Sequence, residues 1–213
     1  MQILVLAKEP LTGRVKTRLC PPLSFEEAAA IAAASLADTL DASIAAGADE
    51  VVLILDGQPG WWCPAGVRVV AQVDAPFGDR LEAAWTHATG PAIQIGMDTP
   101  QANVSVLQAA MTALEQTDPT GGVIGPATDG GWWLLGLHQA LAGAFDGVPM
   151  SDVRTAKFQV ARIAELGVLL SEIETLTDVD TVDQLLVVAG QTHPHSRFHQ
   201  AFRLLGRTMP DGA

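Results

Sequence analysis

Short apolar runs alternate with amphipathic segments along almost the whole chain, and this alternation restricts the possible fold more than any other feature. The apolar runs are rich in Val, Ile and Leu, as strands are when both of their faces are buried. The segments between them carry apolar side chains at helical spacing. Strands that alternate with helices predict a three-layer α/β/α fold around a mixed, mainly parallel sheet.

Apolar patterns, turn residues and helix caps place the expected elements on the chain. Strands are expected at residues 2–7, 49–57, 66–72, 91–98 and 168–173, with a strand–turn–strand unit at 121–137. Helices are expected at residues 24–47, 78–90, 101–116, 155–167 and 179–190. The first helix has the clearest limits, because Ser24 and Glu27 match a capping box and Gly47 is a typical helix-stop residue. We expect one α/β domain over residues 1–190, followed by a C-terminal helix and loose tail over 191–213.

The charge balance narrows the class of partner. The chain carries 12 Lys and Arg against 24 Asp and Glu, which argues against nucleic-acid binding because a phosphate backbone needs a broad cationic surface. No run reaches the roughly 18 apolar residues of a membrane span, and the N-terminus does not match a signal peptide. Cys20 and Cys63 are too few for a disulfide scaffold. We therefore expect a cytoplasmic protein, and the sequence does not determine its oligomeric state.

The most basic segment of this acidic chain directly follows the first expected strand. Lys8, Arg14, Lys16 and Arg18 lie within eleven residues, together with Gly13. Ligands of α/β sheets bind beyond the carboxyl ends of the strands, where this segment should lie. Its cations suit phosphate, and its glycine lets backbone amides approach a ligand. The segment has neither a P-loop nor a dinucleotide fingerprint. We interpret it as another kind of phosphate-binding loop; the alternative is a solvated loop whose cations offset nearby acids.

Two aspartates are candidate metal ligands. Asp98 ends the fourth expected strand, at the same sheet edge as the basic segment, and Mg²⁺ commonly uses one or two carboxylates together with substrate phosphates. The local alternative is that Asp98 or Thr99 caps the next helix and Pro100 opens it. Asp180, at the start of the last expected helix, is a candidate second ligand. Acids at that position also simply complement the helix dipole.

The stretch from Asp129 through Gly130 and Gly131 to Trp132 has two interpretations. Asp-Gly is typical of a tight hairpin turn. The glycines and the aromatic ring would equally suit the floor and wall of an acceptor site, with Asp129 as a base or a hydroxyl-binding group. Arg80, at the start of another expected helix, either contacts the ligand or pairs with nearby acids.

Five stretches, taken in order, resemble the small bacterial glycosyltransferase-like proteins of the nucleotide-diphospho-sugar transferase superfamily. They are AKEPLTGRVKTRL, FGDRLEAAW, IGMDTP, GPATDGGWWLLGL and TDVDTVDQL, and they extend to about residue 188. The resemblance implies a GT-A-like fold whose first loop holds a nucleotide and its phosphates. By position, the implied nucleotide-binding residues are Lys8, Gly13, Arg14, Lys16 and Arg18. We add Ala7 and Arg80 as candidate nucleotide-binding residues. The resemblance also implies a metal on Asp98, and an acceptor site near Asp129, Gly130, Gly131 and Trp132.

Some positions depart from the family pattern. Val182 stands where these proteins often have proline, Met150 stands where they often have tryptophan, and the chain has no tyrosine. The single carboxylate of IGMDTP also resembles that of small-molecule guanylyltransferases, which share the fold.

Three functions follow as hypotheses. The first is a transferase that acts on a nucleoside-diphosphate sugar and a small-molecule acceptor, with Mg²⁺ or Mn²⁺ on Asp98 and Asp180. Its catalytic residues would be Asp129, Lys16 and Arg18. The second is a nucleotidylyltransferase that joins a nucleoside triphosphate to a phosphorylated small molecule and releases pyrophosphate. The third is a nucleotide-binding module without turnover.

Overall fold

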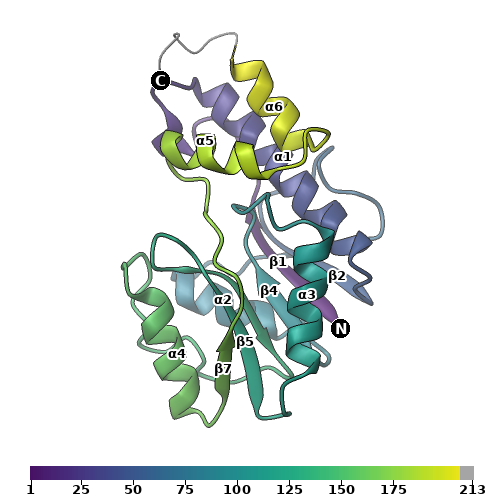
Figure 1. Ribbon diagram of the computed structural model, residues 1–213, viewed down its shortest axis with the longest axis vertical. Coiled ribbons are helices and arrows are strands. Elements are labelled where there is room, and N and C mark those ends of the chain that lie inside the picture. The colour runs from purple at the N-terminus through teal and green to yellow at the C-terminus, as the bar shows by residue number, and fades with distance from the viewer. Residues whose placement is uncertain (207–213) are drawn as a thin grey trace.

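The computed structural model describes residues 1–206 and shows a three-layer α/β/α fold (Figure 1). Its strands are β1 (Gln2–Lys8), β2 (Glu50–Asp56), β3 (Arg68–Ala71), β4 (Ala92–Ile95), β5 (Gly121–Pro126), β6 (Trp132–Leu137) and β7 (Leu169–Glu172). Its helices are α1 (Phe25–Ala45), α2 (Phe77–Trp85), α3 (Val104–Glu115), α4 (Thr155–Glu165), α5 (Val182–Gln191) and α6 (Arg197–Leu205), with a 3₁₀ turn, η1 (Thr17–Leu19). The predicted order of strands and helices is confirmed.

The seven strands form one sheet in the order β3-β2-β1-β4-β6-β5-β7. The pairs β1–β2, β1–β4, β2–β3 and β5–β7 are parallel, whereas β6 runs antiparallel to both β4 and β5. The predicted mixed, mainly parallel sheet is therefore confirmed. The antiparallel strand arises because β5 and β6 are joined by a hairpin turn, the strand–turn–strand unit expected from the sequence.

Alternating side chains of β1 face two separate layers of helices. Ile3 and Val5 pack in a cluster with Leu36 of α1 and Leu107 of α3, whereas Leu4 packs on the opposite face in a cluster with residues of α2 and α4. The successive side chains of a strand point to opposite faces, so an apolar run of this kind needs cover on both sides. This is why β1 lies in the middle of the sheet.

Helix α1 begins and ends where the sequence predicts. The Ser24 hydroxyl accepts a hydrogen bond from the Glu27 amide at 3.2 Å, and the Glu27 carboxylate accepts one from the Ser24 amide at 2.8 Å. The helix stops just before Gly47, whose φ of +89° is a left-handed conformation that glycine adopts without strain.

The C-terminal helix α6 packs on α1 at one end of the molecule, beside α5 (Figure 1). Phe198 is fully buried in a third apolar cluster, which also contains Ile31 of α1 and Leu185 of α5. The Asp38 carboxylate of α1 accepts hydrogen bonds from the amides of Arg197 and Phe198 and thereby caps the start of α6. The expected helix in the tail is present. Residues 207–213, where we expected a loose end, lie outside the described residues.

Helix α1 is long and apolar enough to cross a membrane by length and composition alone. However, 67% of its apolar window is buried inside the protein, where it covers one face of the sheet. A core helix of an α/β fold passes the same test, so this is weak evidence of a membrane span.

Strand β4 ends at Ile95, three residues earlier than predicted, so Asp98 lies in a loop rather than at the end of a strand. The backbone beyond β4 leaves the sheet because its carbonyls bond elsewhere. The Met97 carbonyl accepts a hydrogen bond from the Ser35 hydroxyl of α1 at 2.6 Å, and the Asp98 carbonyl accepts one from the Val179 amide at 2.9 Å.

Candidate functional site

A pocket of about 680 Å³ opens beyond the carboxyl ends of β1 and β4. It brings together the loops that the sequence placed at this sheet edge. Eleven of the predicted site residues line it: Ala7, Lys8, Arg14, Lys16, Arg18, Arg80, Asp98, Asp129, Gly131, Trp132 and Asp180. Gly13 and Gly130 are not part of its wall. Such a concave site with a few convergent charges is typical of small-molecule binding.

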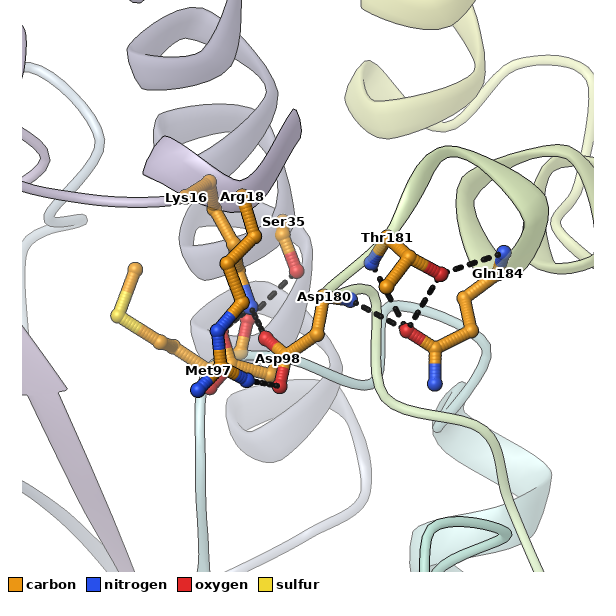
Figure 2. Close-up of polar contacts among 8 residues, drawn as sticks. All are labelled: Lys16, Arg18, Ser35, Met97, Asp98, Asp180, Thr181 and Gln184. Carbon is orange, nitrogen blue, oxygen red and sulfur yellow. Dashed lines mark hydrogen bonds and ion pairs between the residues drawn. The ribbon is translucent and has the colours of Figure 1, made fainter. Parts of the chain in front are cut away.

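Lys16 lies at the centre of the charged wall, between two carboxylates (Figure 2). Its Nζ is 2.5 Å from Oδ1 of Asp98 and 2.9 Å from Oδ1 of Asp180. Only 8% of the Lys16 side chain is exposed, although both aspartates are more than a third exposed. The backbone of Lys16 has a left-handed conformation, with φ 48° and ψ 33°, just before η1.

The charges around Lys16 decide its protonation. Burial by itself would lower the pKa of the ammonium, but the two carboxylates outweigh burial and raise it above the usual value for lysine. Lys16 is therefore held as a cation. Arg18 adds a weaker contact, with Nη1 3.7 Å from Oδ2 of Asp180, and its side chain is 76% exposed.

Local hydrogen bonds fix both aspartates. The contacts of Met97 with Ser35, and of Asp98 with Val179, hold the loop of Asp98 against α1 and against the segment before α5.

The prediction that Asp98 or Thr99 caps the next helix is wrong, because α3 begins at Val104 and the Asn103 side chain caps it.

Asp180 immediately precedes the cap of α5. The Gln184 side-chain oxygen accepts hydrogen bonds from the amides of Asp180 and Thr181, at 3.1 and 2.8 Å (Figure 2). Helix α5 begins at Val182 with Thr181 as its N-cap, so Asp183, and not Asp180, is the acid of its first turn. The carboxylate of Asp180 is left to contact Lys16.

Asp178 is a pocket residue that the sequence did not single out. Burial, followed by the charges of Asp98 and Asp129, raises its pKa to about 7. In the sequence, Asp178, Asp180 and Asp183 lie close together near a helix start, where acids simply complement the helix dipole. The signal that identifies Asp178, proximity to Asp98 and Asp129, arises only after folding.

The segment at Asp129 is both a hairpin turn and a wall of the pocket. Oδ1 of Asp129 accepts a hydrogen bond from the Gly131 amide at 2.8 Å, as expected for a turn. Gly130 has a φ of +90°, and a Cβ added there would lie 1.9 Å from the carbonyl oxygen of Val153. The Gly130 carbonyl also accepts a hydrogen bond from the Ala156 amide at 2.9 Å. The absence of a side chain at Gly130 therefore lets the segment that precedes α4 pack directly against the hairpin turn.

Arg80 has no acidic partner among residues 1–206. Its Nη1 donates to the Gln72 side-chain oxygen at 3.2 Å, and its guanidinium lies 5.2 Å from the centre of the Phe77 ring. Gln72 in turn donates to the carbonyls of Ala7 and Ile54, at 2.7 and 3.1 Å, which joins Arg80 to the ends of β1 and β2. The alternative that Arg80 pairs with nearby acids is therefore wrong. Gln72, which positions it, carries no recognisable signal in the sequence.

Gly13 has a φ of +74°, and nothing lies within 4 Å of an added Cβ. The turn needs its backbone conformation, and its open surroundings leave space beside the basic segment.

The residues present fit a hard divalent cation. Oxygens of Asp98 and Asp180 converge on one point, which the Lys16 ammonium occupies. Carboxylate oxygens are the donors that Mg²⁺ and Mn²⁺ use, and Mg²⁺ sites often take their other ligands from water and phosphate. Within residues 1–206 no three His, Cys, Asp or Glu side chains surround a single metal position.

A family model matches residues 30–152, more than half of the chain. It is described as an uncharacterized protein conserved in bacteria, DUF2064. The chain belongs to this family. The matched part of this DUF2064 member contains Asp98 and Asp129, whereas the basic segment precedes it and Asp180 follows it. No curated protein matched the sequence.

Solved structures share the fold at low identity. A protein from Desulfovibrio desulfuricans, which carries the provisional name of nucleotide-diphospho-sugar transferase, matches with a TM-score of 0.82 at 23% identity, over 97% of this chain and 95% of that one. A nucleotidyl transferase from Methanothermobacter matches with a TM-score of 0.58 at 16% identity, over 96% and 99%. Rv0371c from Mycobacterium tuberculosis, in complex with manganese, matches with a TM-score of 0.54 at 18% identity, over 88% and 97%. These likenesses confirm the predicted nucleotide-diphospho-sugar transferase fold.

Proposed function

We propose that this DUF2064 protein is a cytoplasmic, metal-dependent transferase that acts on a nucleoside-diphosphate sugar and a small-molecule acceptor. One observation carries the proposal. The pocket at the carboxyl edge of the sheet places a cluster of cations beside two carboxylates that converge on one cation position. The fold shared with a protein provisionally named as such a transferase supports it, as does the manganese complex of Rv0371c. The two cysteines are free, which suits a reducing compartment.

The phosphates of the donor would bind along the basic segment. Lys8, Arg14 and Arg18 are exposed and line the pocket around the buried Lys16. Charged donors of this kind stabilise the phosphate oxygens in the ground state, and stabilise them further as the diphosphate leaves. Arg80 is pre-positioned by Gln72 for an additional contact with the nucleotide.

Asp98 and Asp180 would hold Mg²⁺ or Mn²⁺, whose charge would stabilise the leaving diphosphate. The bond between the anomeric carbon and the diphosphate oxygen breaks, and a bond from that carbon to the acceptor oxygen forms. The acceptor's proton passes to the carboxylate of Asp129. No hydrogen bond to Oδ2 of Asp129 exists within residues 1–206, and Asp129 lines the pocket, so that oxygen is available to the acceptor.

The experiment is an incubation with nucleoside-diphosphate sugars of different bases and a panel of acceptors, in the presence of Mn²⁺. Release of nucleoside diphosphate that depends on both the acceptor and the metal supports the proposal. Asp129→Asn should retain binding and lose turnover. If nucleotides bind but no donor gives a product, the transferase proposal is wrong and the protein is a nucleotide-binding module without turnover.

A second function is favoured by the exposed cations. Lys8 and Arg14 line the pocket and have no ion-pair partner among residues 1–206, so they are available to the additional phosphate of a triphosphate. A nucleotidylyltransferase would join the α-phosphate of a nucleoside triphosphate to a phosphorylated acceptor. Pyrophosphate release from a triphosphate with such an acceptor distinguishes it from release of nucleoside diphosphate.

A further inference from the structure

The ammonium of Lys16 occupies the position where a metal ion coordinated by Asp98 and Asp180 would lie. Its Nζ is within hydrogen-bond distance of both carboxylates, and no other basic side chain of residues 1–206 contacts Asp98. Lys16 contacts both acids, whereas Arg18 contacts only Asp180 (Figure 2). An ammonium and a divalent cation repel each other, and both need the same oxygens. They therefore cannot share this position.

We propose that Lys16 is an internal occupant of the metal position, which a metal displaces and which then turns to the phosphates of the nucleotide. This inference rests on the proposed function only in taking Asp98 and Asp180 as the cation site. It assigns Lys16 a role in the order of binding, in addition to a phosphate contact.

The loop is built so that only the side chain needs to move. Val15 and Leu19, on either side of Lys16 and η1, are buried, which anchors the backbone. The Lys16 side chain itself lines the pocket, and four rotatable bonds give its ammonium a long reach from a fixed backbone. Arg14 and Arg18 line the same pocket, so phosphates bound there would lie beside the displaced ammonium.

The exchange has a thermodynamic consequence. Without phosphate, a metal must compete with a buried ammonium that both carboxylates contact. With phosphate present, the displaced ammonium gains a new partner. Metal and phosphate then strengthen each other's binding, and this coupling is reciprocal.

The first test is Mn²⁺ binding measured by electron paramagnetic resonance, with no nucleotide present. Lys16→Met keeps most of the length of the side chain and removes the ammonium. We expect it to bind Mn²⁺ at least about 10-fold more tightly than wild type, within the usual range of such couplings. Lys157→Met is the matched control, because it makes the same substitution at an exposed lysine of α4 that does not line the pocket. It should change the affinity by less than about 3-fold, as expected for a solvent-exposed charge.

Equal affinity of Lys16→Met and wild type would overturn the inference. So would an equal gain in both variants, which would indicate a general charge effect, or the absence of Mn²⁺ binding in all three proteins.

The second test uses the wild-type chain, so it does not depend on the folding of a variant. The protein has three lysines, of which Lys157 is exposed on α4. We expect Lys16 to resist acetylation relative to Lys157 in a chelator, and to become several-fold more reactive in Mg²⁺ while Lys157 does not change. Lys16 that is already reactive in the chelator, or that stays unreactive in Mg²⁺, would contradict the exchange.

Neither test requires turnover or a known base. If metal displaces Lys16 but no transferase product forms, this inference holds and the proposed function is wrong. If product forms but metal does not displace Lys16, the proposed function holds and this inference is wrong.

Discussion

The hydroxyl of Ser35 donates a hydrogen bond to the carbonyl of Met97 across 2.6 Å, and so fastens the loop of Asp98 to the middle of α1. Ser35 is buried, with 2% of its surface exposed. The contact connects the core helix to the candidate cation site, because Asp98 is the next residue along the chain (Figure 2).

Ser35→Ala should lower both stability and metal affinity. It leaves the Met97 carbonyl without this partner, and a buried acceptor that loses its hydrogen bond costs about 1–3 kcal/mol. The loop that holds Asp98 also loses an anchor. Urea unfolding and Mn²⁺ titration measure the two effects.

Ser43→Ala is the matched control for that change. Ser43 is fully buried on the same helix, but its hydroxyl donates to the Thr39 carbonyl of its own helix, far from Asp98. It should leave Mn²⁺ affinity unchanged. If both alanine variants bind Mn²⁺ like wild type, Ser35 does not position the site.

Gly130→Ala should separate the segment before α4 from the hairpin turn. The new Cβ would lie 1.9 Å from the Val153 carbonyl oxygen, in addition to the strain of a φ near +90°. Gly47 has nearly the same φ, +89°, and nothing lies within 4 Å of a Cβ added there. Gly47→Ala is therefore the control that measures the backbone strain alone.

We expect Gly47→Ala to cost about 1–2 kcal/mol, the usual cost of a left-handed alanine. Gly130→Ala should cost clearly more and should also weaken acceptor binding. Thermal unfolding of the pair measures the difference, and equal losses would show that contact with Val153 is unimportant.

Asp178 should make the metal-free protein less stable as the pH rises. Its pKa of about 7 in the folded state lies above the ordinary value of 3.8. The protonated form therefore favours folding. This contribution is complete below about pH 4 and is lost as the pH rises through 7.

Asp178→Asn removes that dependence. In the presence of a chelator, the variant should match wild type near pH 4 and exceed it by on the order of 1–4 kcal/mol near pH 8. Asp183→Asn, an exposed acid in the first turn of α5, is the charge control and should show no such trend. A stability difference for Asp178→Asn that is constant with pH would contradict the burial of its charge.

Phe198→Ala should show whether α6 belongs to the folded unit. The ring is fully buried against α1 and α5, so its loss should cost about 3–5 kcal/mol. Phe202→Ala, on the same helix but only partly buried, should cost about 1–2 kcal/mol. Equal and small losses in urea unfolding would mean that α6 contributes little to stability.

Much of the fold could be predicted from local patterns. The run at β1 has apolar side chains on both faces, which requires a central strand, and Ser24, Glu27 and Gly47 mark the limits of α1. These signals are local in sequence. The early end of β4 was missed because it depends on a contact between Met97 and Ser35, 62 residues apart.

The candidate site was only partly predictable for the same reason. The sequence placed Lys16 among phosphate ligands and Asp98 and Asp180 among metal ligands, yet it gave no sign that these three side chains contact one another. Lys16 and Asp180 are 164 residues apart. Asp178 was missed because its environment comes from folding and not from its neighbours in sequence.

The most direct test of the account is a calorimetric titration with nucleoside diphosphates of each base in the presence of Mn²⁺. We predict that at least one binds to the wild-type protein, that Asp98→Ala abolishes or greatly weakens this binding, and that Asp118→Ala leaves it unchanged. Asp118 is an exposed acid before β5, at the opposite edge of the sheet. No binding by any nucleotide, or equal binding to the wild-type and Asp98→Ala proteins, would contradict the central claim that this pocket holds a metal–nucleotide complex.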